Sequence, residues 1–353
     1  MPKRTSDTKE RRVTLKTLAE HLHLTAGTIS AALNDSAAAR AIPEHTKRRI
    51  LEAARELNYK PNYFARSLRL QRTYTIGVIA QQIGDPYGAA IISGVEEYLR
   101  SSEYFFLTVI HRHDQRVLQN YSQMLLARGV EGFITVDTSI KEKPALPTVA
   151  VAGHRHVPGV TNITIDHKIA VRLALIHLLE NGHRDIAFLK GQKDSSDSKT
   201  RWTAICDVAK ELGVHVRPEL TVQIETDLAT PELGYPAAKQ LLARKQHFTA
   251  LFAYNDVSAI GAIQAFHEAG LRVPEDVSVV GFDDIPLAVI FKPELTTVCQ
   301  PLRRMGQIAA QTIIEQIEKT AEYTPEITIE PELIQRASSG RVKELRRVVE
   351  MTF

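Results

Sequence analysis

The sequence predicts a small helical head followed by a larger α/β body that holds two parallel sheets. Three observations support this fold class. Apolar residues recur at helical spacing through residues 13–57, strand-like apolar runs alternate with helical patterns from residue 74 onward, and basic charge is concentrated in the first 72 residues. The first pattern is typical of a helical bundle and the second of strands joined by covering helices.

Length and composition fit a globular protein of two or three domains. The chain has 353 residues, of which 44% are hydrophobic and 24% are charged, which is enough apolar material for a large core. No run approaches the roughly 18–20 apolar residues of a membrane span, and the N-terminus leads into no apolar signal segment. Two cysteines, Cys206 and Cys299, cannot form a disulfide framework, so we expect a cytoplasmic, nucleoid-associated protein.

Charge is distributed unevenly along the chain. Residues 1–72 hold 15 basic and 7 acidic residues, a net charge of +8, whereas residues 73–353 hold 29 basic and 34 acidic residues, a net charge of −5. A basic head on an acidic body indicates that the head meets a polyanion. A solvated basic tail is the alternative, but such a tail would lack helical patterning.

Three short helices are predicted in the head. The first ends at Leu22 with Thr14 as its N-cap, and the second runs over residues 26–33 with Thr25 as its N-cap. A third helix follows Pro43, and its inward face is expected to hold Ile50, Leu51, Ala54 and Leu57. Two helices joined by a tight turn are typical of a helix-turn-helix, which places one helix in the DNA major groove. Spacing alone would equally allow a generic three-helix bundle.

One more helical turn is predicted over residues 62–69, capped by Asn62. A helix of about eight residues is shorter than the roughly 12–15 needed for marginal stability in water, so it should fold only when something holds it. On DNA, Arg66, Arg69 and Arg72 would contact phosphates. Leu68 would act as an apolar wedge between base pairs. A flexible linker whose leucine packs on the body is the alternative, and spacing does not decide between them.

The body reads as a repeated alternation of strands and helices. The predicted strands cover residues 76–80, 105–110, 132–136, 148–152, 185–189, 250–254 and 278–282. The helical stretches between them cover residues 89–100, 118–128, 170–179, 202–212, 231–242 and 257–269. Continuous apolar strands joined by helices predict a parallel sheet covered on both faces, and more than 260 residues of this pattern predict two such sheets.

Polar residues stand where ligands of such sheets bind, beyond the carboxyl ends of strands. Asp283 and Asn255 each follow a predicted strand, Arg112 follows another, and Arg201 opens a helix after a loop rich in serine and aspartate. Carboxylate, amide and guanidinium groups together suit the adjacent hydroxyls of a sugar or another small polar molecule. Helix capping is an equally weighted alternative for Asn255.

Other motifs of the sequence give weaker evidence about function. The chain has three His-x-His pairs, but no cysteine or carboxylate cluster accompanies them, so we expect no metal site. The common dinucleotide, nucleoside-triphosphate and serine-hydrolase motifs are absent from the sequence, and we expect neither a cofactor nor catalysis. Trp202 is expected to pack in the core. The tail over residues 341–353 spaces apolar residues like two weak heptads, too few to predict a tetramerisation helix.

Residues 13–72 resemble the DNA-binding head of the lactose-repressor/galactose-repressor (LacI/GalR) family. The matching pieces are Val13-Thr14-Leu15, Leu18-Ala19, Thr28-Ile29-Ser30, Leu33-Asn34 and Tyr59-Lys60-Pro61-Asn62 followed by Ala65-Arg66-Ser67-Leu68-Arg69. The resemblance implies that the last segment is a hinge helix whose leucine, here Leu68, enters the minor groove.

The head departs from that family at its base-reading positions. Ala26, Gly27 and Ala31 stand at the start and middle of the recognition helix, and none has a side-chain donor to read base edges. Alanine methyls can contact only thymine methyls. We therefore expect sequence choice to depend more on DNA shape and on the hinge helix. The residues expected to contact DNA are Thr14, Thr25, Ala26, Gly27, Thr28, Ser30, Ala31, Asn34, Asn62, Arg66, Leu68 and Arg69.

The resemblance continues through the body to about residue 338. Its most specific stretch runs from Val273 to Pro286 and includes Gly281-Phe282-Asp283-Asp284. The resemblance implies the fold of periplasmic sugar-binding proteins, with two sheets, three crossovers and a cleft between them. Matching positions place Tyr87, Arg112, Arg201, Asn255 and Asp283 in that cleft. Where many relatives have an aspartate after the strand at 148–152, this chain has Gly153-His154-Arg155, so its effector is expected to differ from the usual simple sugars.

The sequence thus predicts a dimeric transcriptional regulator that binds a pseudo-palindromic DNA operator under control of a small-molecule effector. The resemblance implies that it is a repressor. We expect the head at residues 13–58, the hinge at 59–74, the effector-binding and dimerisation domain at 75–340, and a tail at 341–353. A secreted solute-binding protein and an α/β enzyme are the alternatives. The basic head argues against the first, and the lack of an evident nucleophile–base pair argues against the second.

Overall fold

The computed structural model describes residues 13–343 except residues 35, 61, 154–155, 194 and 226–229. The chain divides into two compact units, residues 1–73 and residues 74–353, which are called the head and the body and are described separately. Within the described ranges, no helix is long and apolar enough to cross a membrane.

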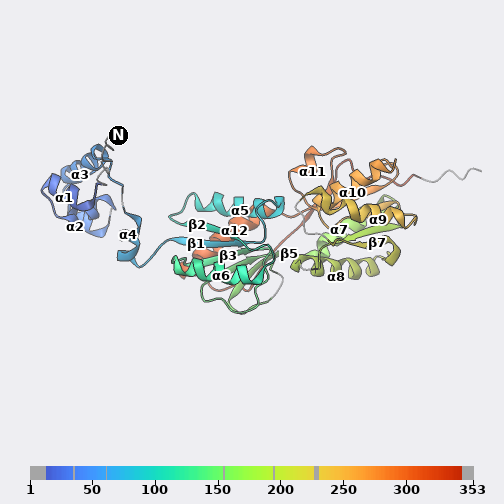
Figure 1. The fold of residues 1–353 in the computed structure, drawn as a ribbon, viewed down its shortest axis with the longest axis horizontal. Coiled ribbons are helices and arrows are strands. Elements are labelled where there is room, and N and C mark those ends of the chain that lie inside the picture. Colours follow the sequence, from blue (N-terminus) through green and yellow to red (C-terminus); the bar gives the residue numbers. More distant parts are fainter. Residues whose placement is uncertain are drawn as a thin grey trace, which may run out of the picture. The chain divides into compact units, whose positions relative to one another are not determined.

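The head is helical (Figure 1). Thr14 caps the first helix in a capping box and Thr25 caps the second, as the sequence predicts. The elements of the head are α1 (Leu15–Leu22), α2 (Ala26–Leu33), the 3-10 helix η1 (Ala37–Ala41), α3 (Glu44–Glu56) and α4 (Tyr63–Leu70). The predicted helix-turn-helix is confirmed as α1 and α2.

A small apolar core holds the first three helices of the head together. Leu18 of α1, Ile29 of α2 and Ile50 of α3 are fully buried in it. The prediction that Leu51 faces inward is wrong, because that side chain is 43% exposed. Leu51 lies about 100° around the helix from Ile50, and the inward face instead continues through Ala53.

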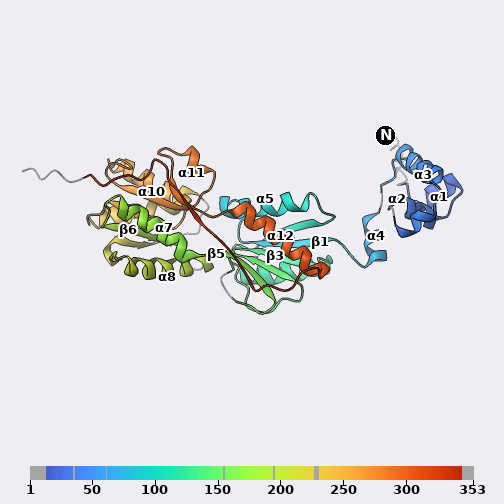
Figure 2. The ribbon, with the colours of Figure 1, turned by 180° about the vertical axis from the view of Figure 1, so that it is seen from behind.

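The body is built from two lobes, each with a six-stranded sheet (Figure 2). In the amino lobe the strands run in the order β11-β5-β4-β3-β1-β2, and every neighbouring pair is parallel. Its strands are β1 (Thr75–Ala80), β2 (Phe105–Ile110), β3 (Gly132–Val136), β4 (Thr148–Val151), β5 (Val160–Ile165) and β11 (Glu326–Ile329). Its helices are α5 (Pro86–Leu99), α6 (Gln115–Ala127) and α12 (Leu302–Glu318).

The carboxy lobe repeats this plan with one exception. Its strand order is β12-β10-β9-β8-β6-β7, and β12 pairs antiparallel with β10, so the predicted second parallel sheet carries one antiparallel edge strand. Its strands are β6 (Ile186–Lys190), β7 (Thr221–Gln223), β8 (Ala250–Phe252), β9 (Ser278–Asp283), β10 (Thr296–Cys299) and β12 (Glu332–Ile334). Its helices are α7 (His167–Glu180), α8 (Ser196–Glu211), η2 (Pro218–Leu220), η3 (Pro231–Leu233), α9 (Tyr235–Ala243), α10 (Asp256–Glu268) and α11 (Leu287–Ile290).

The chain crosses between the lobes three times. It passes from β5 to α7, from β10 to α12, and from β11 to β12. The three crossovers implied by the family resemblance are therefore confirmed. Each lobe is completed by segments from distant parts of the chain.

The helices α5 and α12 of the amino lobe pack backbone to backbone. A Cβ atom added to Gly94 would lie 1.9 Å from the carbonyl oxygen of Arg303, and one added to Gly306 would lie 2.0 Å from the carbonyl oxygen of Ile91. Only glycine fits such an approach. Because α12 begins directly after the second crossing, this packing fixes where that crossing enters the amino lobe.

Candidate functional site

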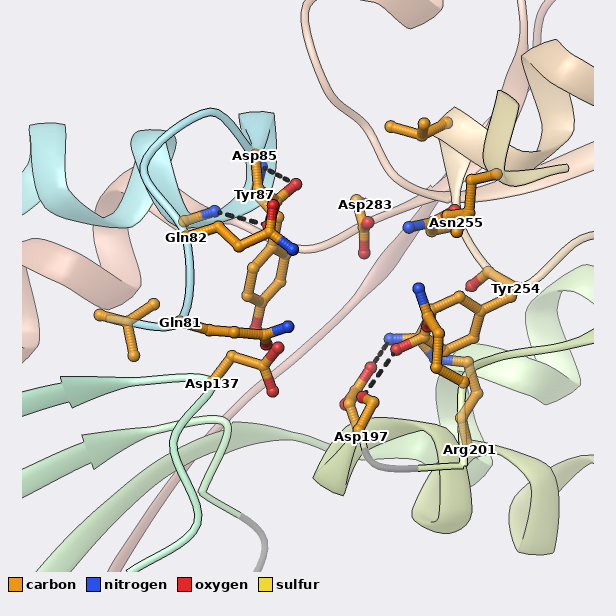
Figure 3. Close-up of a pocket in the computed structure, with 16 residues that line it drawn as sticks. Gln81, Gln82, Asp85, Tyr87, Asp137, Asp197, Arg201, Tyr254, Asn255 and Asp283 are labelled. Carbon is orange, nitrogen blue, oxygen red and sulfur yellow. Dashed lines mark hydrogen bonds and ion pairs between the residues drawn. The ribbon is translucent and has the colours of Figure 1, made fainter. Parts of the chain in front are cut away.

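A cavity lies between the two lobes of the body (Figure 3). Both lobes contribute polar side chains to it. The amino lobe contributes Gln81, Gln82, Asp85, Tyr87, Gly88, Val136 and Asp137. The carboxy lobe contributes Gln192, Ser195, Asp197, Arg201, Leu233, Tyr254, Asn255, Val257 and Asp283. This cavity is called the cleft below.

The cleft lies at the carboxyl ends of the strands. Gln81 directly follows β1 and Asp137 directly follows β3, while Asp283 ends β9 and Asn255 stands three residues after β8. Parallel sheets bind ligands at this edge, because the turns that follow each strand gather their side chains there.

Arg201 is the most constrained side chain of the cleft. It is 2% exposed, and its guanidinium bonds to the carboxylate of Asp197 and donates to the backbone carbonyl of Tyr254. The guanidinium also lies 3.7 Å from the ring centre of Phe282 and 4.8 Å from that of Tyr254. These contacts hold a charged, planar donor in one orientation, as bidentate recognition of a polar ligand requires.

Two buried polar atoms of the cleft lack a hydrogen-bond partner among the described residues. They are Nε of Arg201 and the hydroxyl of Tyr87. Buried polar groups are nearly always paired, and an exception at a cleft points to a group that a ligand satisfies. Burial also raises the pKa of the Tyr87 hydroxyl well above its usual value, so the group is a neutral donor and acceptor.

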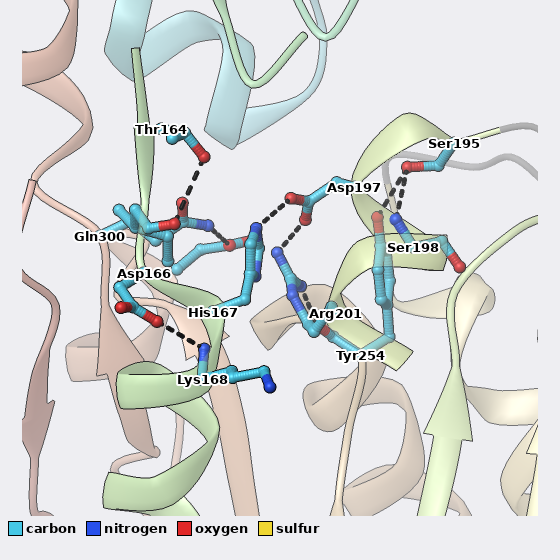
Figure 4. A network of polar contacts seen from close by, with 12 residues as sticks. Thr164, Asp166, His167, Lys168, Ser195, Asp197, Ser198, Arg201, Tyr254 and Gln300 are labelled. Carbon is cyan, nitrogen blue, oxygen red and sulfur yellow. Dashed lines mark hydrogen bonds and ion pairs between the residues drawn. The ribbon is translucent and has the colours of Figure 1, made fainter. Parts of the chain in front are cut away.

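Two of the acidic residues of the cleft, Asp197 and Asp283, contact residues at the crossings between the lobes. Gln300, at the second crossing, donates from Nε2 to Oδ1 of Asp283 at 2.6 Å, and both residues are buried. Nε2 of His167, at the first crossing, lies 3.1 Å from Oδ1 of Asp197 (Figure 4). Burial raises the pKa of the Asp283 carboxyl well above its usual value. The positions of these two carboxyl groups are therefore tied to the segments about which the lobes would move.

Asn255 caps a helix and also lies in the lining of the cleft. Its side chain accepts a hydrogen bond from the backbone N–H of Ser258 at 2.9 Å and so caps α10. The same residue lines the cleft. Capping fixes its amide in place, which prepares it for a ligand.

The DNA-facing candidates of the head are mostly on its surface. Ala26 and Gly27 at the start of α2 are exposed, and Leu68 of α4 is 83% exposed. Ser30 and Ala31, in contrast, are each 9% exposed. The other candidates are exposed or half-buried, namely Thr14, Thr25, Thr28, Asn34, Asn62, Arg66 and Arg69.

Comparison with known proteins shows which family the chain belongs to. Residues 175–339 match the model of a periplasmic binding protein-like domain. The chain is 33% identical to the HTH-type transcriptional repressor PurR of Erwinia tasmaniensis over 348 residues, which cover 95% of this chain and 99% of that protein. It is also 33% identical to the PurR repressor of Pectobacterium carotovorum over 92% of this chain and 96% of that one. The chain belongs to the LacI/GalR family.

Solved structures of transcriptional regulators share the fold. The Lac repressor dimer bound to operator and an anti-inducer superposes with a TM-score of 0.83 at 23% identity, covering 94% of this chain and all of that one. The transcriptional regulator CelR in complex with cellobiose superposes with a TM-score of 0.68 at 25% identity, covering 93% of this chain and all of that one. As a LacI/GalR protein, this chain is a DNA-binding transcriptional repressor controlled by a small-molecule effector.

Four of the five effector-site residues expected from the LacI/GalR resemblance line the cleft. They are Tyr87, Arg201, Asn255 and Asp283. The fifth, Arg112, is exposed and lies outside the lining. It follows β2, the edge strand of its sheet, and the carboxyl end of an edge strand lies away from the centre of the sheet, where the cleft forms.

Sequence reasoning did not single out several residues that line the cleft. Gln81 and Asp137 follow strands that were predicted with nearly correct ends, so the rule about strand ends would have found them. Asp197 lies four residues before Arg201, the spacing at which helical side chains meet. The remaining polar residues, Gln82, Asp85, Gln192 and Ser195, lie in loops or at helix starts, where the sequence gives no such signal.

The remaining motifs of the sequence are the His-x-His pairs, Trp202 and the C-terminal tail. Within the part of the chain that the structure describes, no group of three or more metal-ligating side chains occurs. Trp202 packs edge-on against the buried ring of Phe188, with the Lys190 ammonium 4.6 Å from its ring centre. His154 and most of the tail over 341–353 lie outside the described residues.

Proposed function

We propose that the cleft is the effector site of this repressor and that its ligand is a small polar molecule, a sugar or a sugar derivative. The observation that carries the proposal is the pair of buried unpartnered atoms, Arg201 Nε and the Tyr87 hydroxyl, on opposite walls of a polar cleft. A ligand with several hydroxyl or carbonyl groups would satisfy both atoms at once. It would then hold the two lobes together.

Solved relatives support this ligand class. The CelR structure holds cellobiose, and a LacI family regulator from Enterococcus faecium, 25% identical with a TM-score of 0.67, was solved with ribose. The cleft of this chain offers the acidic, amide and guanidinium groups that suit vicinal hydroxyls. The sequence departs from many relatives after β4, where Gly153 follows in place of their aspartate, and this supports a ligand that differs from the usual simple sugars.

The regulatory mechanism follows as a linkage between ligand and DNA. A ligand that bridges the lobes favours the closed arrangement in proportion to its differential affinity. The body begins at β1, only four residues after α4 ends at Leu70. Closure of the lobes therefore changes the constraints on α4, the hinge helix, whose folding on DNA places Leu68 in the minor groove.

We further propose that the working form is a homodimer on a pseudo-palindromic operator. Paired hinge helices require two chains, and two-fold operators match two-fold proteins. The body also exposes large apolar side chains of the kind that interfaces cover. Phe105 on the edge strand β2 is 61% exposed, and Val289 and Ile290 of α11 are 50% and 71% exposed.

We also propose that the cleft binds its ligand without transforming it and that the protein acts in the cytoplasm, on operator DNA. The side chains of Arg201 and Asp197 form a buried ion pair with each other. Such a pair suits recognition of a ligand better than transfer of a proton. A secreted solute-binding protein would share the body but would have no use for the helix-turn-helix.

A screen with one matched pair of variants tests the effector site. Sugars, sugar acids and nucleobases are tested for a rise in the melting temperature of the wild-type protein, because a ligand that binds only the folded form stabilises it. Tyr87→Phe removes a hydroxyl without a partner, so it should not lower the melting temperature of the free protein. It should reduce the shift produced by each hit.

Tyr104→Phe is the control, since Tyr104 is a buried tyrosine of the same lobe whose hydroxyl bonds to Glu318 rather than facing the cleft. Its response to each hit should equal that of the wild type. Hits that stabilise all three proteins equally would place the effector outside the cleft. A hit must also change the affinity for operator DNA in a gel-shift assay.

A further inference from the structure

The hinge helix α4 needs a partner within the head. It has eight residues, too few for stability by itself. Of its described side chains, Ser67 is half-buried and the others, Ala65, Arg66, Leu68, Arg69 and Leu70, are exposed. None of them belongs to the apolar core of the head. Burial of these side chains therefore does not hold the helix to the other three.

A hydrogen bond joins this helix to the recognition helix α2. Nη1 of Arg69 donates to Oγ of Ser30 at 2.8 Å, between residues 39 positions apart in the sequence. Ser30 lies in the middle of α2 and is 9% exposed. Hydrogen bonds with an ionised donor are stronger than neutral ones, and this one is partly shielded from water.

The acceptor is itself held in place on α2. The Nδ2 atom of Asn34 donates to the backbone carbonyl of Ser30 at 2.7 Å and lies 3.4 Å from its Oγ. Earlier in the same helix, the hydroxyls of Thr25 and Thr28 bond to each other at 2.9 Å. The polar side chains of the recognition helix are thus engaged within the head, and its exposed first turn presents Ala26 and Gly27.

We propose that Arg69 is a positioning residue that couples the hinge helix to the recognition helix through Ser30. Major-groove docking of α2 then orients α4, so that the two helices engage the operator as one unit. Arginine has five N–H donors, so Arg69 can hold Ser30 and still contact a phosphate. This coupling supplies part of the sequence selectivity that Ala26 and Gly27 cannot provide. The proposal rests on the DNA role of α4 proposed above.

The competing explanation is that Arg69 and Ser30 each contact the DNA backbone independently. A double-mutant cycle separates the two, because independent contacts contribute additively and coupled ones do not. The DNA is a duplex selected from random sequence by the wild-type protein, and an unrelated duplex of equal length measures non-specific binding.

Ser30→Ala should weaken binding to the selected duplex about tenfold, the effect expected for loss of one hydrogen bond to a charged group. It should leave non-specific binding unchanged. Arg69→Gln should weaken binding further and lower the slope of log affinity against log salt by about one, because it also removes a phosphate contact. Adding Ser30→Ala to Arg69→Gln should then cost less than about twofold, since the bond is already gone.

Two controls complete the design. Ser36→Ala makes the same chemical change in the head at a serine whose side chain makes no capping hydrogen bond, and it should bind like the wild type. Circular dichroism melts of each head variant in the full chain show whether it folds. Ser30→Ala should melt like the wild type apart from α4, because alanine is a good helix former.

Additive losses from Ser30→Ala and Arg69→Gln, or no loss from Ser30→Ala, would overturn the coupling. The Leu68→Ala variant distinguishes failure of the coupling from failure of the proposed DNA role of α4. If it reduces binding to the selected duplex far more than non-specific binding, the DNA role of α4 stands and only the coupling is lost. If it affects both duplexes equally, the proposed role of the hinge helix fails with it.

Discussion

The buried carboxyl group of Asp256 makes the stability of the carboxy lobe depend on pH. Asp256 is fully buried at the start of α10, where it accepts hydrogen bonds from the backbone N–H of Ile285 and the hydroxyl of Thr297. Burial raises its pKa from 3.8 to about 7. Between those two values the folded state binds the proton more tightly than the unfolded state, so the free energy of unfolding falls as the pH rises through this window.

The size of the effect follows from the two pKa values of Asp256. They differ by about 3 units, and one unit corresponds to about 1.4 kcal/mol, so ionisation costs the fold at most about 4 kcal/mol. Asp256→Asn keeps an oxygen that accepts from the N–H of Ile285 and turns an N–H toward the Thr297 hydroxyl, which can rotate to accept it. The amide therefore mimics the neutral carboxyl. We expect the variant to approach the wild type near pH 4, and to become progressively more stable than it as the pH rises, by up to about 4 kcal/mol at pH 8.

Urea unfolding at pH 5 to 8 measures this difference. Trp202, the single tryptophan of the chain, lies in α8 of the same lobe and reports its unfolding by fluorescence. Other titrating groups, such as His111, whose pKa burial lowers to about 4, are common to both proteins and cancel in the comparison. A difference in stability that stays constant from pH 5 to pH 8 would refute the reasoning.

Three further substitutions test other parts of the structure. Leu68→Ala should weaken operator binding much more than non-specific binding in gel shifts, because the wedge acts only in kinked DNA; an equal loss on both would contradict it. Gly27→Ala should stabilise the head by about 0.5–1 kcal/mol in thermal melts, since its Cβ would meet only Thr25 Oγ1, at 3.7 Å; a lower melting temperature would contradict this. Gly94→Ala should destabilise the amino lobe by about 1–3 kcal/mol in urea, because its Cβ would clash with the carbonyl of Arg303; an unchanged midpoint would show that α5 and α12 separate freely.

Much of the fold was predictable because many of its elements have clear periods, although the 17-residue helix α12 was not predicted. The strand-like runs at 76–80, 132–136 and 278–282 are fully buried in the structure, as continuous apolar strands of a parallel sheet should be. The strands that were missed are β5 and the short ones, such as β7 and β12, which have only three residues. No period is visible in three residues. Such strands are defined by partners far away in the sequence, as β12 is by β10.

Strand ends and the family resemblance together pointed to Asn255, Asp283 and Arg112, and the first two line the cleft. Arg112 lies outside the lining, because a sequence pattern does not show that β2 is an edge strand. The supporting contacts could not be predicted at all. Gln300 reaches Asp283 from the second crossing, and Ser30 meets Arg69 across the head, so both depend on tertiary packing.

The three crossings also determine when each part of the protein can fold during synthesis. The amino lobe needs α12 and β11, and the carboxy lobe needs β12 at residues 332–334. Neither lobe can complete its sheet until nearly the whole chain has left the ribosome. The core of the head contains only residues within the first 59, so the head can fold as soon as these residues have left the ribosome. A chain cut short anywhere between residues 74 and 301 would therefore carry a folded DNA-binding head without a finished sensor to control it.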